Sequence, residues 1–231
     1  YMALSTSISG VFTPQINRIV ARGEGDEQLT KLFTRVGRIQ FMLLMLVLTG
    51  FIFVGKPFIC AWGGEEYGAA YWIALLLIAP VTVPLIQNIG IEIQRAKNMH
   101  QFRSKVYFCM AIGNALVSIP LGMKFGGIGC ALGTAISMLV GNGFIMNWYY
   151  QTHIGLDMRY FWKHILSIVP AMLPAVALGV LAVRLHTFTG YAGVAAFAVP
   201  YAAVYAAGLY LFAMDESEKD MVRGVMRKIR R

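Results

Sequence analysis

The sequence predicts an all-α membrane protein, a bundle of transmembrane helices, and three observations lead to this fold class. Hydrophobic residues make up 58% of the 231 residues and charged residues only 13%, whereas ordinary soluble domains are about 45–50% apolar and about 25% charged. The apolar residues form runs of about 20, the length of a helix that spans the hydrocarbon core of a bilayer. No strand-like alternation of any length occurs, and helices satisfy their own backbone hydrogen bonds in lipid.

The apolar runs give the predicted elements in chain order. The first run begins at Tyr1 without a signal-peptide pattern, so we expect the chain to be the C-terminal part of a longer protein, with residues 1–21 ending a truncated span. Six complete spans are predicted near 38–55, 69–93, 106–123, 127–150, 164–183 and 190–213. Residues 1–213 are therefore the predicted transmembrane bundle, and residues 214–231 a basic cytoplasmic tail.

Lys and Arg are concentrated in alternate connectors, at 22–37, 94–105 and 151–163 and in the tail. The opposite connectors hold only Lys56, Lys124 and Arg184. Because Lys and Arg are retained in cytoplasmic loops, this pattern predicts that the basic connectors and the C-terminus lie in the cytoplasm. Topology thus accounts for the net charge of +9, and we expect no nucleic-acid partner.

Glycines and other small residues fill residues 125–143, FGGIGCALGTAISMLVGNG. Gly127, Gly129 and Gly133 nearly form a dinucleotide-binding fingerprint, but that motif requires a strand before it. The favoured interpretation is close helix packing by small residues on one helix face. These small residues recur every four positions: Gly129, Gly133, Ser137 and Gly141.

Polar residues lie near the end of the predicted span 69–93, where Pro80 and Pro84 predict a bent or hinged helix. Polar groups inside spans are costly and tend to face cavities or partners. In one interpretation this face lines a water-filled path and Glu92 is a proton- or cation-coupling carboxylate. In the other, which we favour, Glu92 is solvated near the interface and can pair with Arg95.

Two other spans carry candidate polar residues. Arg18 can meet an anionic ligand or can be an ordinary cytoplasmic anchor, and Asn114 can line a path or bond a neighbouring helix. The substrate-pathway or coupling candidates are therefore Gln15, Arg18, Gln87, Asn88, Glu92 and Asn114.

Catalytic and metal-binding patterns are missing from the sequence. The four histidines, at 100, 153, 164 and 186, lack metal-ligand spacing, and no Ser–His–Asp set or juxtaposed carboxylate pair occurs. None of the three cysteines lies in a CxxC pair. We therefore expect a protein that is not an enzyme and that holds no cofactor or metal.

The tail has a helix-start pattern, since Asp215 and Glu218 have capping-box spacing. The following apolar residues share one helical face, which predicts a basic amphipathic helix on the inner leaflet; a frayed, solvated terminus is an equal alternative. These apolar residues are Met221, Val222, Val225, Met226 and Ile229.

Four stretches carry a resemblance to a known family. They are residues 12–24 (FTPQINRIVARGE), 60–72 (CAWGGEEYGAAYW), 153–165 (HIGLDMRYFWKHI) and 94–143 (QRAKNMHQFRSKVYFCMAIGNALVSIPLGMKFGGIGCALGTAISMLVGNG). The chain resembles, over most of residues 1–213, the C-terminal half of polysaccharide and O-antigen (Wzx-type) flippases. These belong to the multidrug/oligosaccharidyl-lipid/polysaccharide exporter superfamily.

The resemblance implies a two-lobed helical transporter of which this chain supplies the second lobe. It implies a multi-pass protein of the bacterial cytoplasmic membrane that moves undecaprenyl-pyrophosphate-linked oligosaccharide between leaflets by alternating access. Its partners would be the lipid-linked oligosaccharide, the lipid bilayer, the missing N-terminal half, and polysaccharide polymerase and assembly proteins. In this half Arg18 is the candidate cation for a pyrophosphate.

Three rival functions stay open at this point. A cation-coupled small-molecule or drug antiporter of the same superfamily would need acidic residues in the other half. A membrane-embedded glycan polymerase or glycosyltransferase would need a long outer loop, and the outer connectors are short. A structural scaffold or an inactive fragment is the third.

Overall fold

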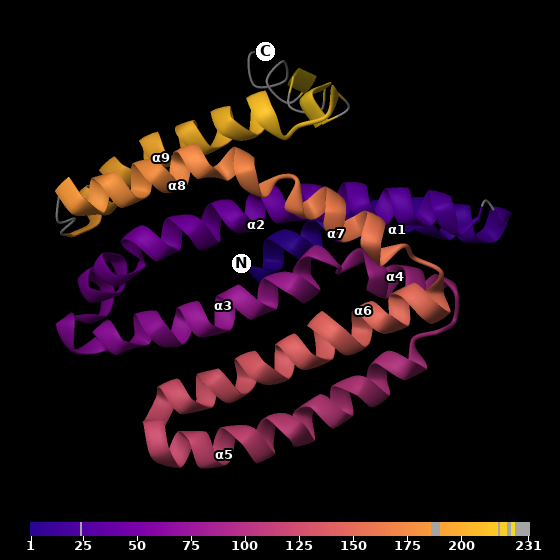
Figure 1. Ribbon diagram of the computed structural model, residues 1–231, viewed down its shortest axis with the longest axis horizontal. Coiled ribbons are helices and arrows are strands. Elements are labelled where there is room, and N and C mark those ends of the chain that lie inside the picture. The colour runs from indigo at the N-terminus through magenta and orange to yellow at the C-terminus, as the bar shows by residue number, and fades with distance from the viewer. Residues whose placement is uncertain (24, 186–189, 217, 221–222, 225–231) are drawn as a thin grey trace.

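The computed structural model describes residues 1–23, 25–185, 190–216, 218–220 and 223–224. Within these residues the chain is helical and contains no strand, so the predicted all-α class is confirmed. Figure 1 shows that the long helices run roughly along one common direction. The predicted amphipathic face at 221–229 lies outside the described residues.

The elements follow one another with short connections. In chain order they are α1 (Met2–Arg22), α2 (Asp26–Gly63), the 3₁₀ turn η1 (Glu65–Ala69), α3 (Ala70–Ile86), α4 (Ile89–Ala96), α5 (Gln101–Met138), the π-helical segment η2 (Leu139–Ile145), α6 (Met146–Tyr149), the π-helical segment η3 (Tyr150–Ile154), α7 (Met158–Leu166), α8 (Val169–Leu185) and α9 (Gly190–Phe212).

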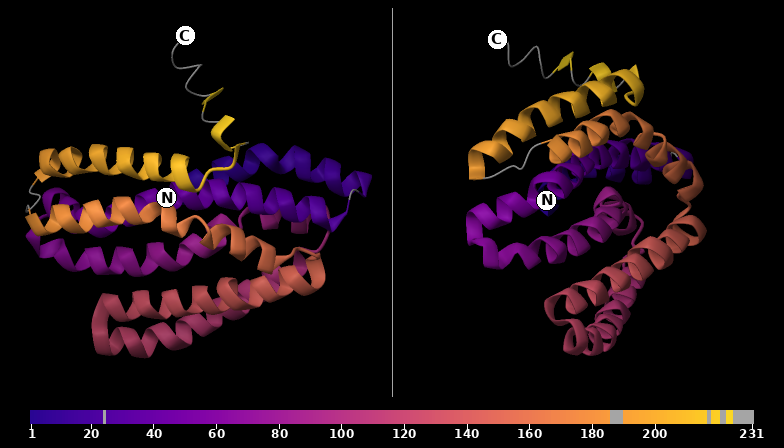
Figure 2. Two further views of the ribbon diagram at one scale, coloured as in Figure 1. Left: turned by 45° about the horizontal axis from the view of Figure 1, so that its top comes forward. Right: turned by 60° about the vertical axis from the view of Figure 1, so that its left-hand side comes forward.

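Five helices among the described residues are long and apolar enough to cross a membrane: Asp26–Gly63, Glu65–Ile86, Gln101–Ile154, Met158–Leu185 and Gly190–Phe212. The chain therefore has the character of a multi-pass membrane protein. The third of these reverses direction at Gly126, which adopts φ 62° and ψ −141°, a conformation that favours glycine. Its two arms lie side by side in Figures 1 and 2, and we call them the hairpin, residues 101–154.

Three predicted boundaries differ from the observed ones. The predicted span 69–93 divides after Ile86, where a tight turn at Gln87 and Asn88 separates α3 from α4. The predicted span 164–183 is interrupted between α7 and α8, beside Pro170. The predicted connector 22–37 is instead largely helical as the first turns of α2.

The helix α2 lies at the centre of the bundle, between α1 and α3 on one side and α8 and α9 on the other (Figures 1 and 2). Its first turns are helical because they bury an apolar face against α7: Phe33 lies 4.7 Å from Phe161, ring centroid to ring centroid. Further along, the Gln40 amide donates hydrogen bonds to Ser5 and Ser9 of α1. The hairpin packs against α3 at the outer side of this core. A cavity lies along the face of the hairpin that is turned toward α3.

Candidate functional site

A cavity of about 400 Å³ lies between the start of α1, the α3–α4 break and both arms of the hairpin. Its wall is mixed, with aliphatic side chains and a set of polar groups that converge from separate elements. Concave, largely apolar sites with a few convergent polar groups are the usual form of ligand pockets. The polar lining residues are Thr6, Asn88, Arg103, Tyr107, Asn114, Thr134, Ser137 and Asn142.

Arg103 supplies the positive charge of this cavity. Its Nη2 donates to the Tyr107 hydroxyl at 2.6 Å and its Nη1 to the Tyr150 hydroxyl at 3.4 Å. The guanidinium carbon lies 4.6 Å from the centroid of the Tyr107 ring, in cation–π range. Its hydrogen-bond partners within the described residues are neutral phenols, and no described carboxylate forms an ion pair with it. The charge of Arg103 is therefore available to an anionic group in the cavity.

Tyr107 extends the polar chain across the cavity, because its hydroxyl donates to Asn142 Oδ1 at 2.9 Å. Asn142 is buried and belongs to the π-helical segment η2 of the second arm. A second polar group lies further along the first arm, where Asn114 Oδ1 accepts from Ser118 at 2.6 Å and from Thr134 at 3.4 Å. Both arms of the hairpin thus contribute side chains that can bind hydroxyl or anionic groups.

Four predicted site residues lie at or near the α3–α4 break and the hairpin. Asn88 and Asn114 line the cavity. Gln87 is buried behind it and donates to Asn147 at 3.0 Å. Glu92 does not line the cavity, and it accepts a hydrogen bond from Arg95 at 2.9 Å.

The two candidates on α1 lie elsewhere. Gln15 and Arg18 are exposed on its surface, and neither belongs to the residues that line the cavity. The structure therefore brings Asn88 and Asn114 together with Arg103, and leaves Gln15, Arg18 and Glu92 apart from them.

The small-residue stripe faces the first arm of the hairpin. A side chain at Gly129 would meet the Leu121 carbonyl, one at Gly133 would meet Ser118, and one at Gly141 would meet Met110. Ser137 lines the cavity instead. Only residues without a large side chain allow the two arms to approach this closely.

Arg103 and Tyr107 were not predicted as site residues, because the basic residues of the connector 94–105 are accounted for by topology. The sequence does contain a pattern that groups them with other cavity residues. Residues 103, 107, 110 and 114 have the i, i+4, i+7, i+11 spacing of one helix face, and all of them line the cavity.

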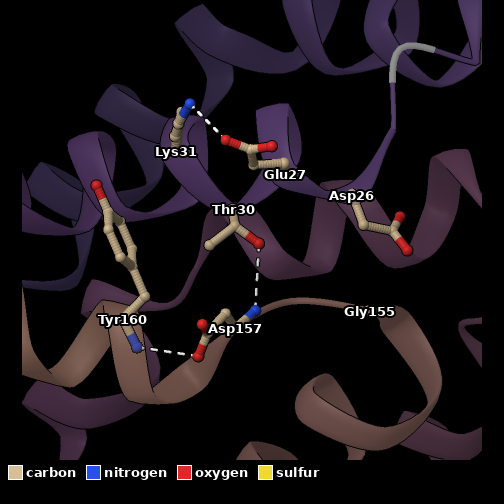
Figure 3. Close-up of a pocket in the computed structure, with 7 residues that line it drawn as sticks. All are labelled: Asp26, Glu27, Thr30, Lys31, Gly155, Asp157 and Tyr160. Atoms are coloured by element: carbon tan, nitrogen blue, oxygen red, sulfur yellow. Dashed lines mark hydrogen bonds and ion pairs between the residues drawn. The ribbon is translucent and has the colours of Figure 1, made fainter.

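A second pocket, of about 270 Å³, lies where α2 begins and α7 begins (Figure 3). Its groups bond one another: the Asp157 N–H donates to Thr30 Oγ1 at 3.2 Å, and the Asp157 carboxylate caps α7 by accepting the Arg159 and Tyr160 N–H groups. At the edge of this pocket Lys97 bonds Asp26 Oδ1 at 2.5 Å. We interpret this pocket as a structural feature, a place where hydrogen bonds hold three connectors together.

Metal binding finds no support in the part of the chain that the structure describes, where no group of three His, Cys, Asp or Glu side chains is placed to hold an ion. No family model matches the chain, and no curated protein and no solved structure matches it.

Proposed function

We propose that this chain forms part of a flippase that moves lipid-linked oligosaccharide across the bacterial cytoplasmic membrane by alternating access, for polysaccharide biosynthesis. The observation that supports it is the position of Arg103, a cation with neutral partners in a cavity of mixed apolar and polar lining. The sequence resemblance to Wzx-type flippases is independent support.

The lining residues suggest how the head of such a substrate is held. A guanidinium group suits phosphate because it is planar, always charged and able to donate two parallel hydrogen bonds. The amides of Asn88 and Asn114 and the hydroxyls of Thr134 and Ser137 can bind sugar hydroxyls. The apolar lining, from residues such as Val81 and Met110, excludes water and strengthens these interactions.

Alternating access requires helices that change their relative positions, and the cavity lies beside a helix break, the turn at 87–88 between α3 and α4. A second break, the turn at 167–168 between α7 and α8, lies away from the cavity. Hinges of this kind absorb backbone changes in a few residues at element ends. In this proposal the hairpin moves relative to α1 and α3 while Arg103 holds the pyrophosphate.

The charge of the cavity suits the anionic head of a flippase substrate. Glu92, the candidate coupling carboxylate of this chain, is paired with Arg95 away from the cavity, so a cation-coupled antiporter would depend on acidic residues in the other half. The charged residue in the cavity lining is Arg103. The assignment of this chain to the second lobe, the other half of the transporter and the assembly partners are all part of the proposal.

The test uses the full-length parent protein in a strain without a redundant flippase. Deletion of the gene should cause labelled lipid-linked oligosaccharide to accumulate on the cytoplasmic face of the membrane, and the wild-type gene should relieve it. Arg103→Gln should fail to relieve it, whereas Arg95→Gln, at an exposed arginine outside the cavity, should succeed. An unchanged distribution after deletion would reject the flippase function and place the antiporter first.

A further inference from the structure

Asn147 occupies an unusual position in the second arm of the hairpin, because its side-chain amide uses its full hydrogen-bonding capacity. Its Oδ1 accepts from Trp162 Nε1 at 2.8 Å and from Gln87 Nε2 at 3.0 Å. Its Nδ2 donates to the backbone carbonyls of Asn142 at 2.7 Å and Gly143 at 2.9 Å. An amide has two lone pairs and two N–H groups, so all four are satisfied within the protein.

The two carbonyls that Asn147 binds belong to the π-helical segment η2. A π turn departs from the i→i−4 ladder of the α-helix and occurs mostly as a single turn, in which a carbonyl accepts the N–H five residues further on, as Gly141 accepts the Met146 N–H. The Asn147 side chain is an additional donor to two carbonyls of this segment, and so stabilises η2.

The segment η2 sets the direction of Asn142. Each residue of an α-helix advances about 100° around its axis, so a turn with an additional residue changes which face later side chains occupy. In the π conformation Asn142 Oδ1 meets the Tyr107 hydroxyl, and this hydroxyl accepts from Arg103. Asn147 is therefore linked to the cation of the cavity through Asn142, whose backbone carbonyl accepts from Asn147 and whose side chain accepts from Tyr107.

We propose that Asn147 is a positioning residue that fixes Arg103 in the cavity and joins its position to the α3–α4 break, through Gln87, and to α7, through Trp162. The part that concerns substrate rests on the proposed function, because it takes Arg103 as the group that binds the anionic head. The part that concerns the network rests on the hydrogen bonds alone. Asn147 itself does not line the cavity.

The first experiment tests the network without any ligand. The full-length protein is purified in detergent, and the melting temperature is measured for Asn147→Asp, Tyr107→Phe and the double variant. Asn147→Asp keeps an acceptor for Gln87 and Trp162 but loses the two donors to η2. Because residues of one network are non-additive, the double variant should lose clearly less than the sum of the single losses.

A matched control uses Asn114, another asparagine of the hairpin that lines the same cavity but bonds Ser118 and Thr134. Asn114→Leu and Tyr107→Phe should lower the melting temperature additively. Additive losses for Asn147 and Tyr107 as well would overturn the network. If Asn147→Asp does not fold, Trp162→Phe removes one donor to Asn147 and should show the same coupling with Tyr107→Phe.

The second experiment measures binding of inorganic pyrophosphate to the same variants. Asn147→Asp should weaken binding about tenfold, the change expected when Arg103 is no longer held in place and loses a hydrogen bond to the charged ligand. The same substitution should add no further loss in the Arg103→Gln background. An equal loss in both backgrounds, or unchanged binding, would overturn the positioning role.

The two experiments separate the two proposals. If the wild-type protein binds no pyrophosphate while the melting temperatures are non-additive, the network is supported and the proposed substrate is rejected. If pyrophosphate binds and needs Arg103 but the melting temperatures are additive, the proposed function is supported and the network is rejected.

Discussion

Arg38 connects three separate segments through its guanidinium group. Its Nε and Nη2 bind the two carboxylate oxygens of Glu218 at 2.9 and 3.0 Å, Nη1 binds the His164 carbonyl and Nη2 also binds the Ala213 carbonyl. Arg38 and Glu218 are each only 5% exposed. The end of α7 and the residues after α9 are thus fastened to α2 by one side chain.

Loss of either partner of this ion pair should be strongly destabilising. Arg38→Ala leaves Glu218 buried without its cation, and breaking a buried pair in this way typically costs about 3–5 kcal/mol. Arg95→Ala removes the exposed pair with Glu92 and should cost less than about 1 kcal/mol. Thermal unfolding in detergent measures both, and equal losses for the two variants would contradict the assignment.

Replacement of Gln94 should stabilise the protein, whereas replacement of Arg38 should destabilise it. The Gln94 side chain is fully buried in α4, and neither its Nε2 nor its Oε1 has a hydrogen-bond partner among the residues that the structure describes. Replacement of an unsatisfied buried amide by an apolar group of similar size removes a penalty of about 1–3 kcal/mol, so Gln94→Leu should raise the melting temperature.

Gln40 is the control for this experiment, because its Nε2 donates to Ser5 and Ser9. Gln40→Leu should lower the melting temperature. A lower melting temperature for Gln94→Leu as well would show that Gln94 has a partner in solution.

Local residue roles followed from the sequence, and distant contacts did not. The capping-box spacing predicted that Glu218 bonds the start of its own helix, and its carboxylate does accept the Asp215 N–H at 2.9 Å. The bond between Glu218 and Arg38 joins residues 180 positions apart, so it depends on the whole helix arrangement. The same is true of Arg103, whose partner Tyr150 comes from the other arm of the hairpin.

At the scale of elements, the hairpin depends on the close approach of its two arms. A Cβ at Gly133 would lie 2.8 Å from the Ser118 Cα, so Gly133→Ala should force the arms apart at a cost of about 1–3 kcal/mol. Gly113 lies in the same hairpin with no atom within 4 Å of a built Cβ, and Gly113→Ala should be neutral or stabilise by about 0.5–1 kcal/mol. Unfolding in detergent compares the two, and similar effects would contradict the packing role.

Element types were predictable where the pattern is local, and element ends were not. Hydrophobic runs identified the helices, and Pro80 and Pro84 indicated a bend near the place where α3 ends. The extension of α2 back to Asp26 depends on Leu29, Phe33 and Val36, which are buried against neighbouring elements. The π-helical segments η2 and η3 did not follow from the hydrophobic runs, which show only that the region is helical.

At the scale of the whole molecule, the basic connectors meet at one end of the bundle. Lys97 binds both Asp26 and the Ile154 carbonyl, which brings three connectors together. The connection between α2 and α3 and the turn of the hairpin lie at the opposite end in Figure 1. This separation agrees with the alternation of charge along the sequence, and it gives the orientation a direct test.

Cysteine labelling of intact cells measures that orientation. In a background without the native cysteines, cysteines at Glu66 and Lys124 should react with a membrane-impermeant thiol reagent. Cysteines at Asn98 and Arg159 should react only after the membrane is opened, because basic connectors remain in the cytoplasm. The reverse pattern would show that the bundle is inserted the other way.

The contact between Arg38 and Glu218 also has a consequence for biosynthesis. A ribosome makes Arg38 of α2 180 residues before Glu218, and domains form in the order of synthesis. Throughout that interval Arg38 lacks its counter-charge, so the nascent bundle holds a guanidinium that is costly to bury alone. A chain terminated after Phe212 keeps this defect permanently. Proteolytic quality control should therefore remove the truncated product faster than the full chain, although every apolar helix described above is present in it.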